Sequence, residues 1–132
     1  MNNRRTAASN RRSYTGARSR AEGAGFESII GNACAYYRSI GLADIEKTPE
    51  PMRPIGSPDR AGRFLACYTK QAQPDYKGVL KGGRAINFEA KHTDSDRLTF
   101  DRVLAAQALR LSRTEALGGV AFVLCSFSGR AF

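Results

Sequence analysis

Apolar side chains recur at helical spacing in the first third of the chain. Spacings of three or four residues are typical of one face of an α-helix, and the positions concerned are Phe26, Ile29, Ile30, Ala33, Cys34 and Tyr37. Gly41 follows this stripe and is expected to end the helix, because glycine commonly terminates helices. The pattern predicts a helix from about Ala21 to Ile40, with Glu27 at the edge of its apolar face.

A proline-rich segment comes next. A short strand is expected at residues 42–47, and four prolines follow between residues 49 and 58. Proline lacks a backbone N–H and disrupts helices and central strands, so this segment is predicted to be a rigid, extended excursion. The residues from Arg63 to Lys70 then have the composition of a strand.

The middle of the chain has the pattern of a β-hairpin. Tyr76–Leu80 and Arg84–His92 flank a turn that contains Gly82 and Gly83, and paired glycines are a strong hairpin signal. Side chains alternate along a strand. In the second strand Ile86, Phe88 and Ala90 should therefore face the core, while Asn87, Glu89 and Lys91 should face a cleft. His92 is expected at the surface, just after the strand.

A second helix and a buried strand complete the pattern. The helix is predicted from about Phe100 to Leu117, with Thr99 as its N-cap and Gln107 on or beside its apolar face. The apolar stripe of this helix is predicted to consist of Phe100, Val103, Leu104, Ala108 and Leu111. Val120–Phe127 is continuously apolar and predicts a buried strand. This order of elements favours one α/β domain over residues 21–132, with a mixed β-sheet flanked by helices.

Positive charge is concentrated at the N-terminus. Of the net charge of +9, six arginines fall before residue 21, where no acidic residue occurs. These arginines are Arg4, Arg5, Arg11, Arg12, Arg18 and Arg20. Residues 1–20 are polar and aperiodic, so they are expected to be a disordered arm. Clustered arginines displace counterions from nucleic acid, which favours a DNA-binding arm over a segment that only increases solubility.

The composition also bears on the compartment. Three widely spaced cysteines, none in a Cys-x-x-Cys pair, are typical of reduced thiols in the cytoplasm rather than of a zinc site or a disulfide framework. No apolar run approaches the ~20 residues of a membrane-spanning helix, so no membrane association is expected.

Two carboxylates and one ammonium fall within the predicted hairpin. Asp75 and Glu89 are suitable oxygen ligands for a hard divalent cation such as Mg²⁺, and the backbone carbonyl of Ala90 offers a third. Lys91 lies on the same strand face as Glu89, where an ammonium can orient a water molecule and stabilise developing negative charge. The alternative is that all three are ordinary solvent-facing strand residues.

The hairpin register discriminates between these two interpretations. A strict two-residue Gly82-Gly83 loop pairs Asp75 with Ala90 and turns Asp75 away from Glu89. An odd-length loop, or a bulge near Gly78, places Asp75 opposite Glu89. A shared site therefore predicts that the hairpin departs from the two-residue form.

These residues together resemble the RecU-type Holliday-junction resolvases, including phage-encoded relatives, within the PD-(D/E)xK nuclease superfamily. The resemblance covers about residues 20–128. It rests on Gly25-Phe26-Glu27, Lys70-Gln71, Pro74-Asp75-Tyr76-Lys77-Gly78, Ile86-Asn87-Phe88-Glu89-Ala90-Lys91, Phe100 to Gln107 and Gly118 to Val123. Relatives of this type continue with a further strand beyond Phe132, so either an incomplete sheet edge or a truncated chain is expected.

The resemblance implies a restriction-endonuclease-like core, a homodimer, and Mg²⁺-dependent cleavage of four-way DNA junctions in recombination and repair, with Mn²⁺ as a substitute metal and no small-molecule cofactor. Asp75 and Glu89 would bind the metal, Lys91 would serve the attacking water, and Glu27 and Gln107 would complete the site. The proline-rich segment, about Pro49–Gln73, would form a protruding stalk that enters the junction. DNA contacts are expected from Arg53, Arg60, Arg63 and Lys70, and from Lys77, Lys81 and Arg84 around the hairpin turn.

Two other functions remain open. The same core could serve a restriction-like or repair nuclease that acts on duplex DNA. A non-catalytic nucleic-acid-binding module is the third possibility, although clustered carboxylates repel phosphate and have no use in a protein that only binds it.

Overall fold

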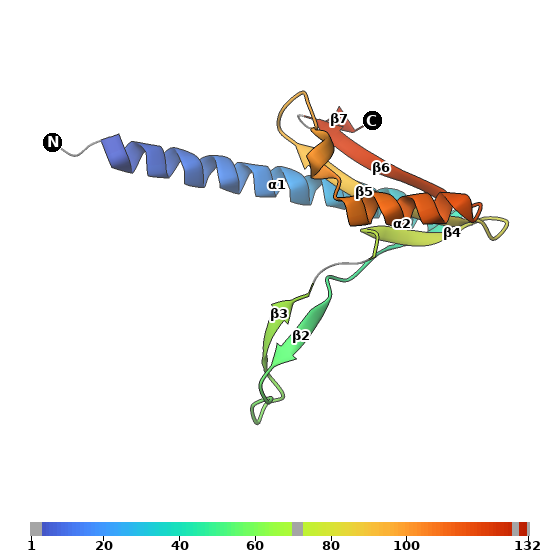
Figure 1. Cartoon of the computed structure of the whole chain (residues 1–132), viewed down its shortest axis with the longest axis horizontal. Coiled ribbons are helices and arrows are strands. Elements are labelled where there is room, and N and C mark those ends of the chain that lie inside the picture. The colour runs from blue at the N-terminus through green and yellow to red at the C-terminus, as the bar shows by residue number, and fades with distance from the viewer. Residues whose placement is uncertain (1–3, 70–72, 128–129, 132) are drawn as a thin grey trace.

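The computed structural model describes residues 4–69, 73–127 and 130–131. Side chains are described for residues 18–127, except for Ser19 and residues 70–72. Figure 1 shows the arrangement of the elements. In chain order they are α1 (Arg4–Ser39), β1 (Ala43–Lys47), β2 (Met52–Ile55), β3 (Leu65–Tyr68), β4 (Tyr76–Leu80), β5 (Ala85–Thr93), the 3-10 helix η1 (Phe100–Arg102), α2 (Ala105–Ala116), β6 (Val120–Phe127) and β7 (Arg130–Ala131).

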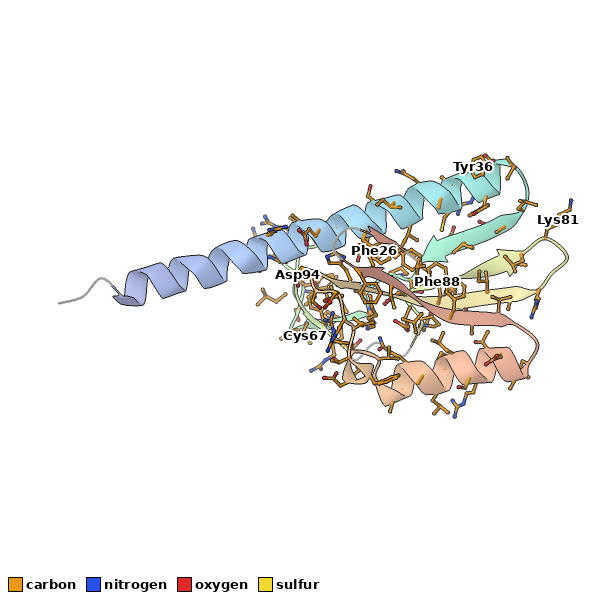
Figure 2. All side chains as sticks on the ribbon, turned by 90° about the horizontal axis from the view of Figure 1, so that it is seen from above. Phe26, Tyr36, Cys67, Lys81, Phe88 and Asp94 are labelled. Atoms are coloured by element: carbon orange, nitrogen blue, oxygen red, sulfur yellow. The ribbon has the colours of Figure 1, made fainter. Side chains whose placement is uncertain are left out.

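The main sheet has five strands in the order β1-β4-β5-β6-β7. Strands β5 and β6 are parallel and are connected through α2, whereas the other neighbouring pairs are antiparallel. Helix α1 covers one face of this sheet and α2 lies on the other, as Figure 2 shows from above. The predicted fold class, a mixed sheet flanked by helices, is confirmed and is consistent with a restriction-endonuclease-like core.

The hydrophobic core lies between α1 and the sheet. Phe26, Ile30 and Cys34 of α1 pack against the sheet, as the apolar stripe predicted, and their buried partners are Ile45, Tyr76, Ile86 and Phe88. The rings of Tyr76, Phe88 and Phe122 stack across three neighbouring strands, with centroids 4.8 Å apart in each pair. This stack ties β4, β5 and β6 together and fixes the position of the β5 backbone.

Helix α1 is longer than the sequence predicted. It begins at Arg4 rather than near Ala21, and its N-terminal part extends beyond the sheet (Figure 1). The sequence predicts a disordered arm over residues 1–20, whereas residues 4–20 are helical in this structure. Helix propagation is far easier than nucleation, and residues 4–20 contain no proline to interrupt a helix that is already nucleated by the packed segment after residue 25. The proposed DNA-binding role of this arm stays a prediction.

The proline-rich segment forms a separate antiparallel ribbon. Strands β2 and β3 pair from Met52↔Tyr68 to Ile55↔Leu65, and this ribbon projects away from the main sheet (Figure 1). Pro54 lies within β2, which is tolerated because the ribbon has only edge strands. The predicted strand from Arg63 to Lys70 is present as the shorter β3, and Lys70 lies outside the described residues.

The second helix departs from its prediction at its N-terminal end. Phe100 is fully exposed and Leu104 is also exposed, because the chain passes through η1 and an extended turn before α2 begins. The two segments are thus not one continuous helix with one apolar face. Thr99 makes no capping hydrogen bond from its side chain. The side chain of Gln107 instead accepts a hydrogen bond from the Leu104 backbone N–H at 3.0 Å. No helix in the described part of the chain is long and apolar enough to span a membrane.

Candidate active site

The hairpin between β4 and β5 has the register that a shared carboxylate site requires. Tyr76 pairs with Phe88 and Gly78 with Ile86, and the Leu80 N–H donates to the Arg84 carbonyl across a three-residue loop. Gly82 and Gly83 both adopt positive φ, at +96° and +91°, which glycine tolerates without strain. The predicted departure from a two-residue loop is confirmed, and Asp75 lies in line with Glu89.

Asp75 and Glu89 occupy neighbouring strand ends. One carboxylate oxygen of Asp75 (Oδ2) accepts a hydrogen bond from the Ala90 backbone N–H at 3.0 Å, which anchors Asp75 beside the residue that follows Glu89. Glu89 is only 1% exposed, and its Oε2 accepts a hydrogen bond of 3.0 Å from Gln107 Nε2 of α2. Gln107 therefore lies inward, as predicted, and connects α2 to the site.

The polar face of β5 is covered more completely than predicted. Asn87 Nδ2 donates to Thr114 Oγ1 of α2 at 2.8 Å, and Glu89 is buried on the same face of β5. The expectation that Asn87 and Glu89 face an open cleft is wrong, because α2 returns across that face on its way from β5 to β6. Lys91, two residues beyond Glu89, is half-buried at the end of this covered face.

The electrostatic state of Glu89 is unusual for a carboxylate. Burial, and next the nearby Asp75 carboxyl, together raise the pKa of the Glu89 carboxyl to about 8, while the Lys91 ammonium opposes the shift. Burial disfavours the ionised form, and two adjacent carboxylates repel each other. A positive charge placed between Asp75 and Glu89 removes both penalties.

The donor atoms suit a hard divalent cation. No group of three His, Cys, Asp or Glu side chains gathers at metal-binding distance among the residues that the structure describes. Mg²⁺, however, usually takes one or two carboxylates and keeps several water ligands. The Asp75 and Glu89 carboxylates, whose mutual repulsion is relieved by a cation, fit that requirement.

Glu27 belongs to a cavity on the other side of Asp75. This cavity has a volume of about 290 Å³, and Glu27, Lys47, Asp75 and Ala90 are among the residues that line it. Glu27 Oε2 lies 2.5 Å from Lys47 Nζ, an ion pair that connects α1 to the end of β1. The structure thus brings Glu27 to the cavity beside Asp75, with Lys47 as its direct partner.

His92 is not a surface residue, in contrast to its prediction. It lies within β5, its side chain is 9% exposed, and its Nε2 lies 3.3 Å from Glu22 Oε2 while its Nδ1 lies 3.2 Å from Ser126 Oγ. Arg102 Nη2 of η1 donates to the His92 carbonyl at 3.1 Å. The ring and backbone of His92 therefore hold α1, β6 and η1 around the end of β5, next to Lys91.

The predicted DNA contacts lie at the periphery. Arg53, Arg60 and Arg63 are exposed on the β2–β3 ribbon and the loop that joins its strands, where Arg63 pairs with Asp59 at 3.0 Å. The exposed basic residues at the hairpin are Lys77, Lys81 and Arg84. Lys77 donates a hydrogen bond to Gln73 Oε1 at 2.6 Å, and Arg84 donates one to the Gly118 carbonyl at 2.7 Å. Arg18 and Arg20 are exposed on α1, whereas the side chains of Arg4, Arg5, Arg11 and Arg12, and all of Lys70, lie outside the described residues.

Sequence reasoning missed Lys47 and Thr48. These two residues lie near Asp75 because Lys47 of β1 pairs with Tyr76 of β4. The sequence pattern did not predict this pairing of strands. The only local signal was their place at the end of an expected strand, just before the prolines.

Comparisons with known proteins place these residues in a family context. The family model described as "RecU: Recombination protein U" matches residues 21–131. The chain is 37% identical over 111 residues to a Holliday junction resolvase RecU of Lactococcus lactis subsp. lactis, covering 80% of this chain and 52% of the relative. It is 35% identical over 108 residues to the protein of that name from Streptococcus gordonii, covering 78% of this chain and 54% of the relative. The chain thus spans about half the length of the curated relatives it matches.

The raised pKa of Glu89 predicts how stability depends on pH in metal-free buffer. The folded protein binds a proton at Glu89 up to about pH 8, whereas the unfolded chain releases it near pH ~4.3. The free energy of unfolding should therefore fall as pH rises between these values. The free energy of unfolding should also fall less in the Glu89→Gln variant. Between pH 5 and 8, its decrease should be smaller than that of the unsubstituted protein by at least ~1 kcal/mol.

Urea unfolding followed by circular dichroism in chelator would measure this difference. Glu115→Gln, which removes an exposed carboxylate from α2, serves as the matched control and should behave like the unsubstituted protein. Equal pH slopes for the Glu89 variant and the control would contradict the assigned electrostatics.

Proposed function

Because this chain belongs to the RecU family, we propose that it is a metal-dependent endonuclease that cleaves four-way DNA junctions by phosphodiester hydrolysis. The observation that carries the proposal is the pair of carboxylates at Asp75 and Glu89, which a three-residue hairpin loop brings into line and Gln107 supports from α2. The names of the relatives, Holliday junction resolvase RecU, favour a branched DNA substrate, and the family description, Recombination protein U, favours a role in recombination. A role in repair and a cytoplasmic location complete the proposal.

Asp75, Glu89 and the backbone carbonyl of Ala90 are the proposed ligands of the metal. Mg²⁺ is the expected ion, with Mn²⁺ as a substitute, because all three donors are oxygens. The bound ion would neutralise phosphate charge and lower the pKa of a coordinated water. Burial of Glu89 under α2 excludes bulk water from this side of the site, which strengthens every electrostatic interaction there.

Lys91 is proposed to orient the attacking water and to stabilise the negative charge that develops on the phosphate. Its position two residues beyond Glu89, on the same strand face, places its ammonium near the carboxylates, and the charge of Lys91 already acts on the pKa of Glu89. Gln107 would hold Glu89 in place through its 3.0 Å hydrogen bond. Glu27 would support the site from the cavity that it shares with Asp75.

The basic residues outside this centre are proposed to bind the phosphate backbone. The β2–β3 ribbon projects from the domain (Figure 1), and its exposed Arg53, Arg60 and Arg63 suit a stalk that enters the open centre of a junction. The arginines of residues 1–20 would add contacts along one arm. Shape recognition by such phosphate contacts needs no base sequence.

Loss of the proposed metal ligand or of the proposed water-orienting lysine should abolish cleavage and leave binding intact. Asp75→Asn and Lys91→Ala are each expected to lower the rate at least ~100-fold, since electrostatic and general acid–base contributions are of that size. The measurement is a gel assay with four-way junction, flap, duplex and single-stranded DNA, each with and without Mg²⁺ or Mn²⁺.

Asp44→Asn, an exposed carboxylate on β1 paired with Arg38, is the control and should cleave normally. Full activity of the Asp75 and Lys91 variants would refute the site assignment. Cleavage of duplex in preference to junction would favour a restriction-like or repair nuclease. Binding without cleavage under any metal would favour a non-catalytic module.

The arm is expected to contribute to DNA affinity through charge. Replacing Arg4, Arg5, Arg11 and Arg12 with Gln retains helix propensity but removes four positive charges. For every phosphate that the arm no longer neutralises, the slope of log affinity against log salt should become shallower by about 0.9. Fluorescence anisotropy of a labelled junction between low and moderate salt measures this slope, and deletion of residues 1–20 should produce a similar change. An unchanged slope in both variants would remove the arm from the binding surface.

A homodimer is proposed because resolution of a four-way junction needs two symmetric cuts, and a two-fold symmetric protein supplies two identical sites. Sedimentation equilibrium at micromolar concentration should give the mass of a dimer without DNA, and of a dimer together with the bound junction when junction DNA is present. A monomer under both conditions would contradict this assembly.

A further inference from the structure

The cavity beside Asp75 holds a cation, Lys47, to which the proposed metal centre gives no role. Glu27, Glu50 and Asp75 line it, together with one cation, Lys47. Lys47 enters from the end of β1, where it pairs with Tyr76 of β4, and its Nζ lies 2.5 Å from Glu27 Oε2. The ammonium therefore lies on the opposite side of Asp75 from Glu89.

A buried hydroxyl without a hydrogen-bond partner among the described residues belongs to a residue that lines the same cavity. Thr48 is 6% exposed, and its Oγ1 finds no hydrogen-bond partner within the described part of the chain. Thr48 lines the cavity, and its backbone N–H donates to the Asp75 carbonyl at 2.8 Å. Buried hydroxyls are normally satisfied by protein or by water, so the unpaired Oγ1 marks a polar place in the wall of the cavity, where the atom itself is covered by its neighbours.

Many phosphodiesterases place two divalent cations about 4 Å apart, one for the attacking oxygen and one for the leaving oxygen. A second ion beside Asp75 would need the Glu27 carboxylate, which the Lys47 ammonium already neutralises. No third His, Cys, Asp or Glu side chain converges with two others among the described residues. An ammonium is a compact point charge with three donors, so it can neutralise a phosphate oxygen as a cation does.

We propose that each site binds a single divalent cation and that the Lys47 ammonium stands where a two-metal enzyme would hold its second cation. This inference rests on the proposed function. Both side chains of the Lys47–Glu27 pair are about half exposed, at 49% and 51%, so the ammonium can contact Glu27 in the free protein and turn toward a phosphate when DNA binds. Lys47 thereby keeps a second metal ion out by occupying its carboxylate ligand and by charge repulsion.

The experiment counts Mn²⁺ bound to the full chain without DNA, by electron paramagnetic resonance of the free ion and by calorimetry. The unsubstituted protein should bind one Mn²⁺ per protomer, and Lys47→Met should bind two, because the Glu27 carboxylate that Lys47 pairs with becomes available to the ion. The double variant Lys47→Met with Glu27→Gln should return to one. Lys47→Arg keeps the charge and should also bind one.

Arg38→Met is the matched control. Arg38 also connects α1 to β1, through an ion pair with Asp44 at 2.8 Å, but neither residue lines the cavity beside Asp75. This variant frees a surface carboxylate elsewhere and should bind one Mn²⁺, which separates a specific second site from non-specific binding to a released carboxylate.

The outcomes are distinct. Two ions on the unsubstituted protein, one ion on Lys47→Met, a second ion retained in the double variant, or a gain in Arg38→Met would each overturn the inference. If Lys47→Met does not fold by circular dichroism, the counts for the unsubstituted protein and for Lys47→Arg still decide it. An unsubstituted protein that binds no Mn²⁺, or an Asp75→Asn variant that keeps its ion, contradicts the proposed function itself.

Discussion

The carboxyl groups of Asp75 and Glu89 lie so close that both cannot be ionised without cost in the isolated protein, and the surrounding structure holds them in place. Asp75 is anchored by the Ala90 backbone N–H, and Glu89 is buried and receives a hydrogen bond from Gln107. Two like charges in a poorly solvated place raise the pKa of one of them, which is the shift seen at Glu89. Active sites commonly retain such local instability because it disappears when the ligand is bound.

The layers of the fold explain how this contact persists. On one face of the sheet, α1 packs Phe26 and Ile30 against the stacked rings of Tyr76 and Phe88. On the other face, α2 contributes Gln107 and Thr114, which form hydrogen bonds with Glu89 and Asn87. Strand β5 is thus fixed from both faces and from both neighbouring strands. A rigid strand can hold a carboxylate in an unfavourable position that a loop would relax.

The distribution of charge reconciles a basic protein with an acidic centre. The net charge of +9 attracts a polyanion over the surface as a whole, where Arg53, Arg60 and Arg63 are exposed on the projecting ribbon. The centre has the opposite local character, with Asp75 beside Glu89 on one side and sharing a cavity with Glu27 on the other. A phosphate can approach these carboxylates only when cations compensate them; Lys47 pairs with Glu27, and the charge of Lys91 acts on Glu89. Binding and cleavage are therefore separable properties of the surface and the centre.

The sequence by itself determined the elements with strong local signals. The apolar stripe from Phe26 to Cys34 identified the packed part of α1, and the Gly82-Gly83 turn with alternating strands identified the hairpin. Local periodicity was sufficient there because each signal lies within one element or one turn. The extension of α1 to Arg4, by contrast, depends on propagation from a nucleus that only packing creates.

Only the tertiary structure decided which surfaces are covered. Periodicity counted Phe100 and Leu104 as buried, but the chain bends between η1 and α2 and leaves both exposed. It could not show that α2 buries Glu89, that His92 contacts Glu22, or that Lys47 reaches the cavity of Asp75. These contacts join residues between 15 and 70 positions apart in the sequence, such as Ala90 to Asp75 and His92 to Glu22. Their formation depends on the crossing of whole elements, a property that no local pattern of residues encodes.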